Sequence, residues 1–247
     1  MTQKIKVGAV SYLNTKPLIY GFEQGMMADR VALRFDYPAN VARQLLQNEI
    51  DIGLVPAAVL PLMKEYHIIS DYCIGTEGAV ASVCLFSDVP LEEISSILLD
   101  YQSRTSVALL KVLLKNHWKI APELTDAGKG FEQQISGSVA GLVIGDRAFE
   151  QRKHSRYIYD LGEVWKAFTG LPFVFAVWAS NKPVSKDFAA DFNEATGKGF
   201  AFLDEIVAGI PPISYDLKKY YTSNISYQLD EPKKAALQKF HQLLALL

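Results

Sequence analysis

The sequence predicts an α/β protein of two lobes, each a mixed sheet flanked by helices, with a cleft between the lobes. Short apolar strands alternate with helical segments from the first residues onward, and two long apolar stretches bracket the middle of the chain. Alternation of this kind builds parallel sheets that bind ligands at the carboxyl ends of their strands. A chain of 247 residues is long enough for two modest domains.

The first part of the chain contains the clearest alternation of strand and helix. Strands are expected at residues 5–10, 31–37 and 51–55, and helices from about residue 15 and over residues 40–47. Alternate apolar side chains of the second strand are expected on one face, namely those of Val31, Leu33, Phe35 and Tyr37.

The middle of the chain repeats this pattern. We expect strands at 97–99 and 140–144, a helix over 105–115 with Ser103 as its N-cap, and a helix that begins near Gly145.

Two apolar stretches, residues 80–86 and 172–179, are expected to be buried strands that pass between the lobes. They predict a discontinuous larger lobe made of residues 1–84 and 178–247 and a smaller inserted lobe of residues 85–177. The chain is expected to end with a strand at 225–229 and an amphipathic packing helix over 232–247.

Composition narrows the classes of partner. The net charge of −2 provides no general field for nucleic acid or an anionic membrane, so we expect a small-molecule ligand held by local groups. The apolar runs are too short for membrane insertion, and polar residues interrupt the first one, which favours a cytoplasmic protein without a secretory signal. Two cysteines and four scattered histidines lack metal-ligand spacing, so we expect neither metal nor cofactor. Composition does not predict the oligomeric state.

The candidate chemistry lies in small polar residues at predicted strand ends. GxGxxG, P-loop, HExxH and GxSxG motifs are absent from the sequence, whereas polar clusters occupy residues 11–16, 103–106 and 145–147. Helix starts with free N–H groups and hydroxyls bind carboxylates, although simple helix capping explains any single cluster as well. Ser82 is expected near the cleft floor, with a hydrogen bond to its own backbone as the alternative.

The segment VGAVSYLNTKPL, residues 7–18, resembles the opening of the chorismate dehydratase family. Further matches are DIGLVP (51–56), SRTS (103–106), GDRA (145–148), DLG (160–162) and TGLPF (169–173), so the resemblance covers nearly the whole chain. It implies a type 2 periplasmic-binding-protein-like fold. It also implies dehydration of chorismate to 3-(1-carboxyvinyloxy)benzoate in the futalosine route to menaquinone.

The resemblance also implies particular site residues. The two that correspond to catalytic residues of the family are Asn14 and Ser82. From the polar clusters we expect the residues that bind the substrate to be Ser11, Ser103, Arg104, Thr105, Ser106, Gly145 and Asp146. The amide of Asn14 does not accept a proton at neutral pH, so either Asp146 or a carboxylate of the substrate takes the proton, and the sequence leaves both open.

A non-catalytic solute-binding protein for a small anionic ligand is the alternative function. This fold most often serves solute binding, and fold alone does not establish an activity. Turnover of the ligand distinguishes the two functions.

Overall fold

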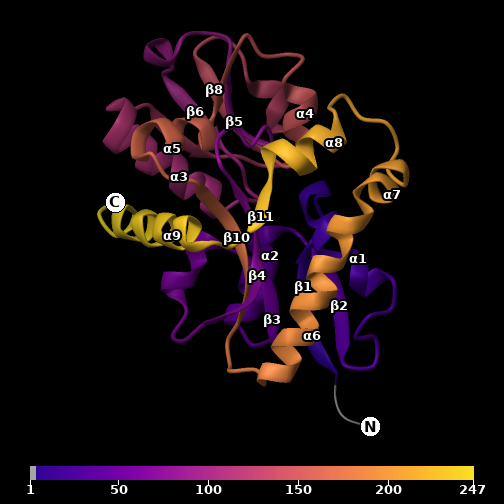
Figure 1. Cartoon of the computed structure of the whole chain (residues 1–247). Helices are drawn as coiled ribbons and strands as arrows, with labels where there is room; N and C mark the ends of the chain where they lie inside the picture. The colour runs from indigo at the N-terminus through magenta and orange to yellow at the C-terminus, as the bar shows by residue number, and fades with distance from the viewer. Residues whose placement is uncertain (1–3) are drawn as a thin grey trace.

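The computed structural model describes residues 4–247, which form two mixed β-sheets with helices packed around them (Figure 1). The strands are β1 (Ile5–Val10), β2 (Val31–Asp36), β3 (Ile52–Pro56), β4 (His67–Thr76), β5 (Val83–Ser87), β6 (Ser96–Leu99), β7 (Glu123–Asp126), β8 (Val139–Ile144), β9 (Tyr157–Asp160), β10 (Phe173–Ser180) and β11 (Ser226–Gln228). The α-helices are α1 (Lys16–Glu23), α2 (Pro38–Leu46), α3 (Thr105–Leu113), α4 (Arg147–Gln151), α5 (Leu161–Thr169), α6 (Lys186–Gly197), α7 (Leu203–Ala208), α8 (Leu217–Lys219) and α9 (Glu231–Leu244).

The first sheet has six strands in the order β11-β4-β10-β3-β1-β2. β1 pairs in parallel with β2 and β3, as the alternation of strands and helices predicts. β10 enters antiparallel between β3 and β4, so a strand from late in the chain completes the centre of a sheet that began at the N-terminus.

The second sheet has five strands in the order β7-β6-β8-β5-β9. β6 is parallel to β7 and β8, whereas β5 is antiparallel to β8 and β9. Both sheets are therefore mixed, which confirms the predicted fold class. In Figure 1 the first sheet lies in the lower half of the molecule and the second in the upper half.

Helices cover the sheets and join them. α1 packs against α6, α2 packs against β3, and α3 contacts both α5 and α9. The largest cluster of buried apolar side chains runs through both sheets, from Val7 on β1 to Leu142 on β8 and Phe240 on α9. The two sheets therefore share one continuous core.

The chain crosses between the sheets through residues 77–82, which join β4 to β5, and returns through α5 and residues 170–172 to β10. The expected boundaries at 84/85 and 177/178 lie inside β5 and β10. In addition, α8 lies beside α4 of the second sheet in Figure 1, and Tyr215 stacks on Phe149 at 4.7 Å between ring centroids. The C-terminal part of the chain thus contacts both sheets, and the exact division into lobes stays a prediction.

Two strands differ from what the sequence pattern indicates. β4 was not predicted, because Ser70 and Asp71 interrupt its apolar pattern and its pairing with β10 has shifts in register. The second strand was expected to span residues 31–37, but β2 ends at Asp36, and Phe35 and Tyr37 are 48% and 46% exposed. β2 is the edge strand of its sheet, so the face near its end has no neighbour to cover it.

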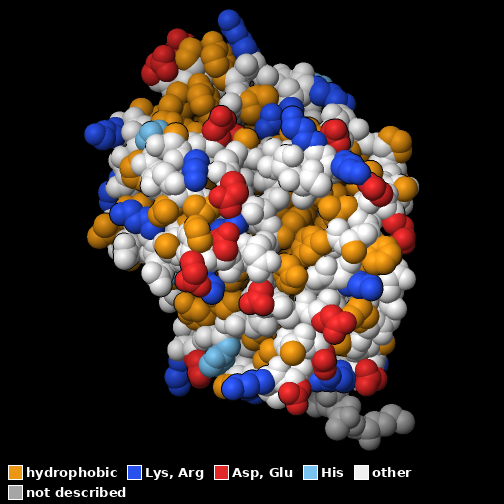
Figure 2. Space-filling model, viewed as in Figure 1, with side chains coloured by type: hydrophobic (Ala, Val, Ile, Leu, Met, Phe, Trp, Pro, Cys, Tyr) orange, Lys and Arg blue, Asp and Glu red, His pale blue; other side chains and the backbone are white. Residues whose placement is uncertain are grey.

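The surface carries no large area of one charge on the face shown in Figure 2, where Lys and Arg side chains lie among Asp and Glu. In the part of the chain that is described, the helices are either too short or too polar to traverse a lipid bilayer.

Replacing Phe240 with Ala tests how strongly α9 is fixed to the shared core. The Phe240 ring is fully buried and lies 5.0 Å from Phe173 and 6.1 Å from Trp165, centroid to centroid. We expect the free energy of unfolding in urea to fall by about 3–4 kcal/mol. Leu246→Ala, at a side chain that is 68% exposed, is the control. A loss no larger than that of the control would contradict this role of α9.

Candidate active site

A cavity lies where the strand ends of the two sheets meet. The space between its lining atoms is about 510 Å³, including its mouth. Its lining residues are Val10, Tyr12, Asn14, Pro38, Pro56, Ile74, Val80, Ser82, Val83, Ser103, Thr105, Ser106, Ile144, Gly145, Phe175 and Ala176. Apolar walls with a few converging polar groups are typical of sites that bind small molecules.

Asn14 reaches this cavity because β1 ends at Val10 and the chain then forms a short 3-10 turn, Leu13–Thr15, before α1. Two tyrosines from the C-terminal part of the chain hold the backbone of this turn. The Tyr221 hydroxyl donates to the carbonyl oxygen of Leu13 at 3.0 Å, and the Tyr227 hydroxyl donates to that of Asn14 at 2.9 Å. The position of Asn14 therefore depends on residues more than 200 positions later.

Ser82 is buried in the cavity wall, next to Asn14. The Tyr220 hydroxyl donates a hydrogen bond of 2.7 Å to Oγ of Ser82. Burial raises the pKa of Tyr220 above its usual range, against the opposing effect of hydrogen bonds with Ser82 and Asn14. Tyr220 is therefore neutral and acts as a fixed donor, which leaves the Ser82 hydroxyl hydrogen available to a ligand.

The start of α3 supplies three more hydroxyl groups to the cavity lining, those of Ser103, Thr105 and Ser106. Oγ of Ser103 accepts the backbone N–H of Ser106 at 3.0 Å, although the N-cap of α3 is Arg104 and not Ser103 as expected. Oγ1 of Thr105 accepts the backbone N–H of Ala58 at 3.2 Å. Both hydroxyl oxygens thus accept a bond from the protein, and their hydrogens are left to donate to a bound oxygen.

Gly145 allows the wall to close around Tyr12. Its φ is +64°, a conformation that side-chain-bearing residues rarely adopt, and an added Cβ would lie 2.9 Å from the Tyr12 ring. The backbone N–H of Gly145 donates to the carbonyl oxygen of Ser82 at 2.8 Å, so this turn also supports the serine.

The structure separates three of the predicted residues from the cavity lining. Ser11 and Asp146 lie in the adjoining hollow at the mouth, where Asp146 accepts the backbone N–H of Leu13 at 3.2 Å. Arg104 is exposed and lines a different hollow, together with Arg43 and Lys111. The helix turn that carries Ser103 and Thr105 inward directs Arg104 outward.

No Asp, Glu, His, Lys or Arg is found among the residues that line the cavity within 4–247. Arg147, close by at the mouth, is held by Asp100 at 2.6 Å, by Glu132 at 2.5 Å and by Gln102 at 3.0 Å. Over the same described range, no three metal-binding side chains cluster. The cavity is therefore a neutral site of hydroxyls, an amide and apolar walls.

Sequence reasoning missed the tyrosines that organise this site, which are Tyr12, Tyr220, Tyr221 and Tyr227. Tyr12 lies in the polar cluster 11–16, and for the other three tyrosines the pair Tyr220-Tyr221 in an otherwise polar stretch was the available signal. It was weak, because nothing local connects this stretch with the beginning of the chain.

The chain forms two mixed sheets that are joined by two crossings, and a cavity lies between the sheets. This arrangement places the protein among two-lobed proteins of the periplasmic-binding-protein type. The chain is similar to protein AF1704 from Archaeoglobus fulgidus, with a TM-score of 0.72 and 15% identity over 99% of this chain and 98% of that chain. It is also similar to the Candida albicans CA3427 gene product, described as having the generic periplasmic binding protein fold, with a TM-score of 0.63 and 12% identity over 99% and 91% of the two chains.

The chain belongs to the menaquinone biosynthesis family, whose model matches residues 5–246. It is also similar to a curated protein named chorismate dehydratase from Thermus thermophilus, with 31% identity over 241 residues and 85% of each chain covered.

Replacing Asp146 with Asn tests the environment of the mouth. Burial raises the pKa of Asp146 to about 6, against the opposing effects of the Leu13 N–H group and Arg147. Because the pKa of Asp146 is higher in the folded than in the unfolded protein, the free energy of unfolding is highest below the usual pKa of an aspartate. It falls as the pH rises through about 6. Asn keeps an acceptor for Leu13 but never ionises.

We therefore expect Asp146→Asn to raise the free energy of unfolding by about 2 kcal/mol at about pH 8 and by much less at about pH 4. Urea unfolding at both pH values measures this difference. Glu123→Gln, at an exposed strand residue, is the control. A difference that does not depend on pH would show that the Asp146 carboxyl is not perturbed.

Proposed function

We propose that this chain is a chorismate dehydratase that converts chorismate to 3-(1-carboxyvinyloxy)benzoate and water. Its family and its relative from Thermus thermophilus support this activity. The observation that carries it is the set of hydroxyls of Ser82, Ser103 and Thr105, whose oxygens accept protein hydrogen bonds while their hydrogens are left to a ligand. Such donors suit a substrate that carries two carboxylates.

Ser103, Thr105 and Ser106 at the start of α3 bind one carboxylate in this proposal. Ser82 binds the other, and Gly145 shapes the wall between them. The N-terminal end of a helix adds backbone N–H groups and a favourable dipole for an anion. The apolar residues Ile74, Val80 and Phe175 hold the ring and exclude water.

In this proposal Ser11 and Asp146 contact the substrate at the mouth of the cavity and are not part of the cavity wall. We do not extend substrate binding to Arg104, which lies in a different hollow.

The reaction breaks the C–H bond at the ring carbon that bears the ether and the C–O bond of the neighbouring hydroxyl. The proton and the hydroxyl leave together as water in the overall reaction, and the ring becomes aromatic. Negative charge spreads towards the ring carboxylate as the proton leaves, and preorganised hydroxyl donors stabilise that charge. Asn14 holds the departing hydroxyl, because its amide both donates and accepts hydrogen bonds.

A carboxylate of the substrate accepts the proton in this proposal. No residue that can act as a base at neutral pH is found among the described lining residues, and the Asp146 carboxyl at the mouth is engaged by Leu13. A bound carboxylate that is desolvated by apolar walls becomes more basic, which favours proton transfer within the substrate.

The futalosine route to menaquinone is the proposed setting of the reaction, and the cytoplasm is the proposed compartment. The family supports the assignment to menaquinone biosynthesis. Both cysteines, Cys73 and Cys84, are buried free thiols, which is typical of proteins from reducing compartments.

Incubation of the purified protein with chorismate tests the proposed activity directly. We expect mass spectrometry to show a product that has lost one water. Asn14→Ala should lower kcat by about a hundredfold, because one preorganised hydrogen-bonding group is lost. Its thermal unfolding should match that of the wild type. Binding of chorismate without turnover by the wild-type protein would instead favour a solute-binding protein.

Replacing Asp146 with Asn also separates the two candidate proton acceptors. If the substrate carboxylate accepts the proton, Asp146→Asn retains kcat within about threefold of the wild type, since no transition-state group is lost. Initial rates over a range of chorismate concentrations measure this effect. A loss of about a thousandfold or more would assign the proton to Asp146.

A further inference from the structure

Ser82 follows a backbone turn that the chain does not adopt without support. The N–H of Ser82 donates to the carbonyl oxygen of Val80 at 2.8 Å, and Ala81 between them has a φ of +65°. A three-residue turn with a positive central φ is rare, and an alanine is strained in it. The turn persists only where surrounding groups hold it.

Asp160 accepts hydrogen bonds that stabilise this turn. Its carboxylate accepts the N–H of Val80 at 3.0 Å and that of Ala81 at 2.7 Å, which are the two residues before Ser82. The same carboxylate caps α5 by accepting the N–H groups of Gly162 at 3.0 Å and Glu163 at 3.2 Å. Asp160 therefore connects the start of a helix with the turn that presents the serine.

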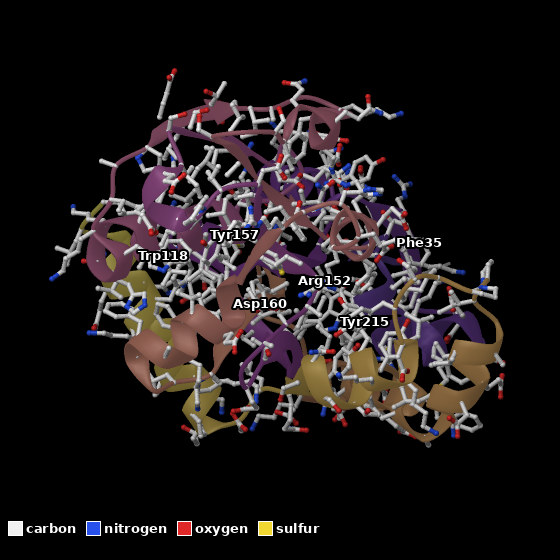
Figure 3. The ribbon with its side chains drawn as sticks, turned by 90° about the horizontal axis from the view of Figure 1, so that it is seen from above. Phe35, Trp118, Arg152, Tyr157, Asp160 and Tyr215 are labelled. Atoms are coloured by element: carbon white, nitrogen blue, oxygen red, sulfur yellow. The ribbon has the colours of Figure 1, made fainter. Side chains whose placement is uncertain are left out.

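Arg152 holds the other side of the same turn. Its Nε donates to the carbonyl oxygen of Ala81 at 3.0 Å, and its guanidinium lies 3.6 Å from the Asp160 carboxylate. Figure 3 shows Arg152 next to Asp160, with Tyr215 beside the arginine, and the guanidinium lies 5.9 Å from the Tyr215 ring centroid. Asp160 thus accepts the N–H of Ala81, and Arg152 donates to its carbonyl oxygen.

The motif DLG at residues 160–162 fits this arrangement. A Cβ at Gly162 would lie 2.5 Å from the carbonyl oxygen of Gly78 and 2.8 Å from Cγ2 of Thr76. A glycine at this position therefore lets α5 approach the crossing segment closely enough for Asp160 to reach it.

We propose that Asp160 is the positioning residue for Ser82, and that it acts by holding the Val80-Ala81 turn with the help of Arg152. This inference rests on the proposed contact of Ser82 with the substrate. Asp160 itself does not line the cavity, so it acts only through the serine.

A double-mutant cycle tests the inference. Asp160→Asn keeps the shape of the side chain but faces an amide N–H group towards backbone donors, so the turn loosens. We expect kcat/KM to fall about tenfold or more in the wild-type background, because a misplaced donor loses transition-state stabilisation. In the Ser82→Ala background the same substitution should have little further effect, since the group it positions is gone.

Asp230→Asn is the matched control. Asp230 caps α9 by accepting the N–H of Lys233 at 3.0 Å, so this variant loses the charge of a helix cap away from the cavity. Its thermal stability should fall while kcat/KM stays at the wild-type value. Arg152→Met is the second variant if Asp160→Asn does not fold, and we expect a smaller loss with the same dependence on Ser82.

The outcomes separate the two proposals. A wild-type kcat/KM for folded Asp160→Asn, or an equal loss in both backgrounds, would overturn the positioning role alone. Wild-type turnover by Ser82→Ala would overturn the proposed role of Ser82 itself. A loss of kcat/KM on Asp160→Asn when Ser82 is present, with no further loss in the Ser82→Ala background, supports both the role of Ser82 and the positioning role of Asp160.

Discussion

The crossing from the first sheet to the second at residues 77–82 imposes the constraint on which the site depends. Val80, Ala81 and Ser82 in this segment are buried, so their backbone polar groups need partners inside the protein. Asn224 donates to the carbonyl oxygen of Ala79 at 3.0 Å, and Gly145 donates to that of Ser82 at 2.8 Å. Partners from distant parts of the chain therefore meet at one turn, and the hydrogen bonds that complete the fold also place the candidate catalytic serine.

The second constraint is that the proposed anion site has no Lys or Arg among its described lining residues. A guanidinium or ammonium group in the cavity would bind the carboxylates of substrate and transition state alike, which lowers KM without raising kcat. The nearest candidate, Arg147, is instead neutralised by Asp100 and Glu132 at the mouth. A hydroxyl whose oxygen accepts a hydrogen bond from the protein has its own hydrogen free to donate to a ligand. In the proposed reaction this donated hydrogen bond becomes stronger as negative charge develops on the ring carboxylate.

Much of the fold was predictable because local pattern and topology agree. β1 was predicted with its correct bounds, and the parallel pairing of β1 with β2 and β3 follows from the helices between them. β4 was not predictable from local pattern, because its place between β10 and β11 is decided by pairing with segments about 100 and 150 residues later.

The candidate site was predictable in part for the same reason. Asn14, Ser103 and Thr105 follow strand ends or open helices, so local sequence places them at the cavity, and Ser82 follows from the crossing. Arg104 lines a different hollow because one residue along a helix turns the side chain by about 100°. Tyr220, Tyr221 and Tyr227 could not be found, since their hydrogen-bond partners lie more than 130 residues earlier in the chain.

The mouth of the cavity shows how binding and closure are connected. The Tyr12 hydroxyl donates to Gln102, and the Leu13 N–H donates to Asp146, so two hydrogen bonds join the end of β1 to the second sheet. Most of the polar residues that line the cavity behind these bonds are buried. Burial raises the pKa of Asp146 to about 6, so above that pH the closed form holds a carboxylate that water would solvate better. Opening of the mouth would expose this carboxylate to water, so opening would cost less free energy with Asp146 ionised than with Asp146 protonated.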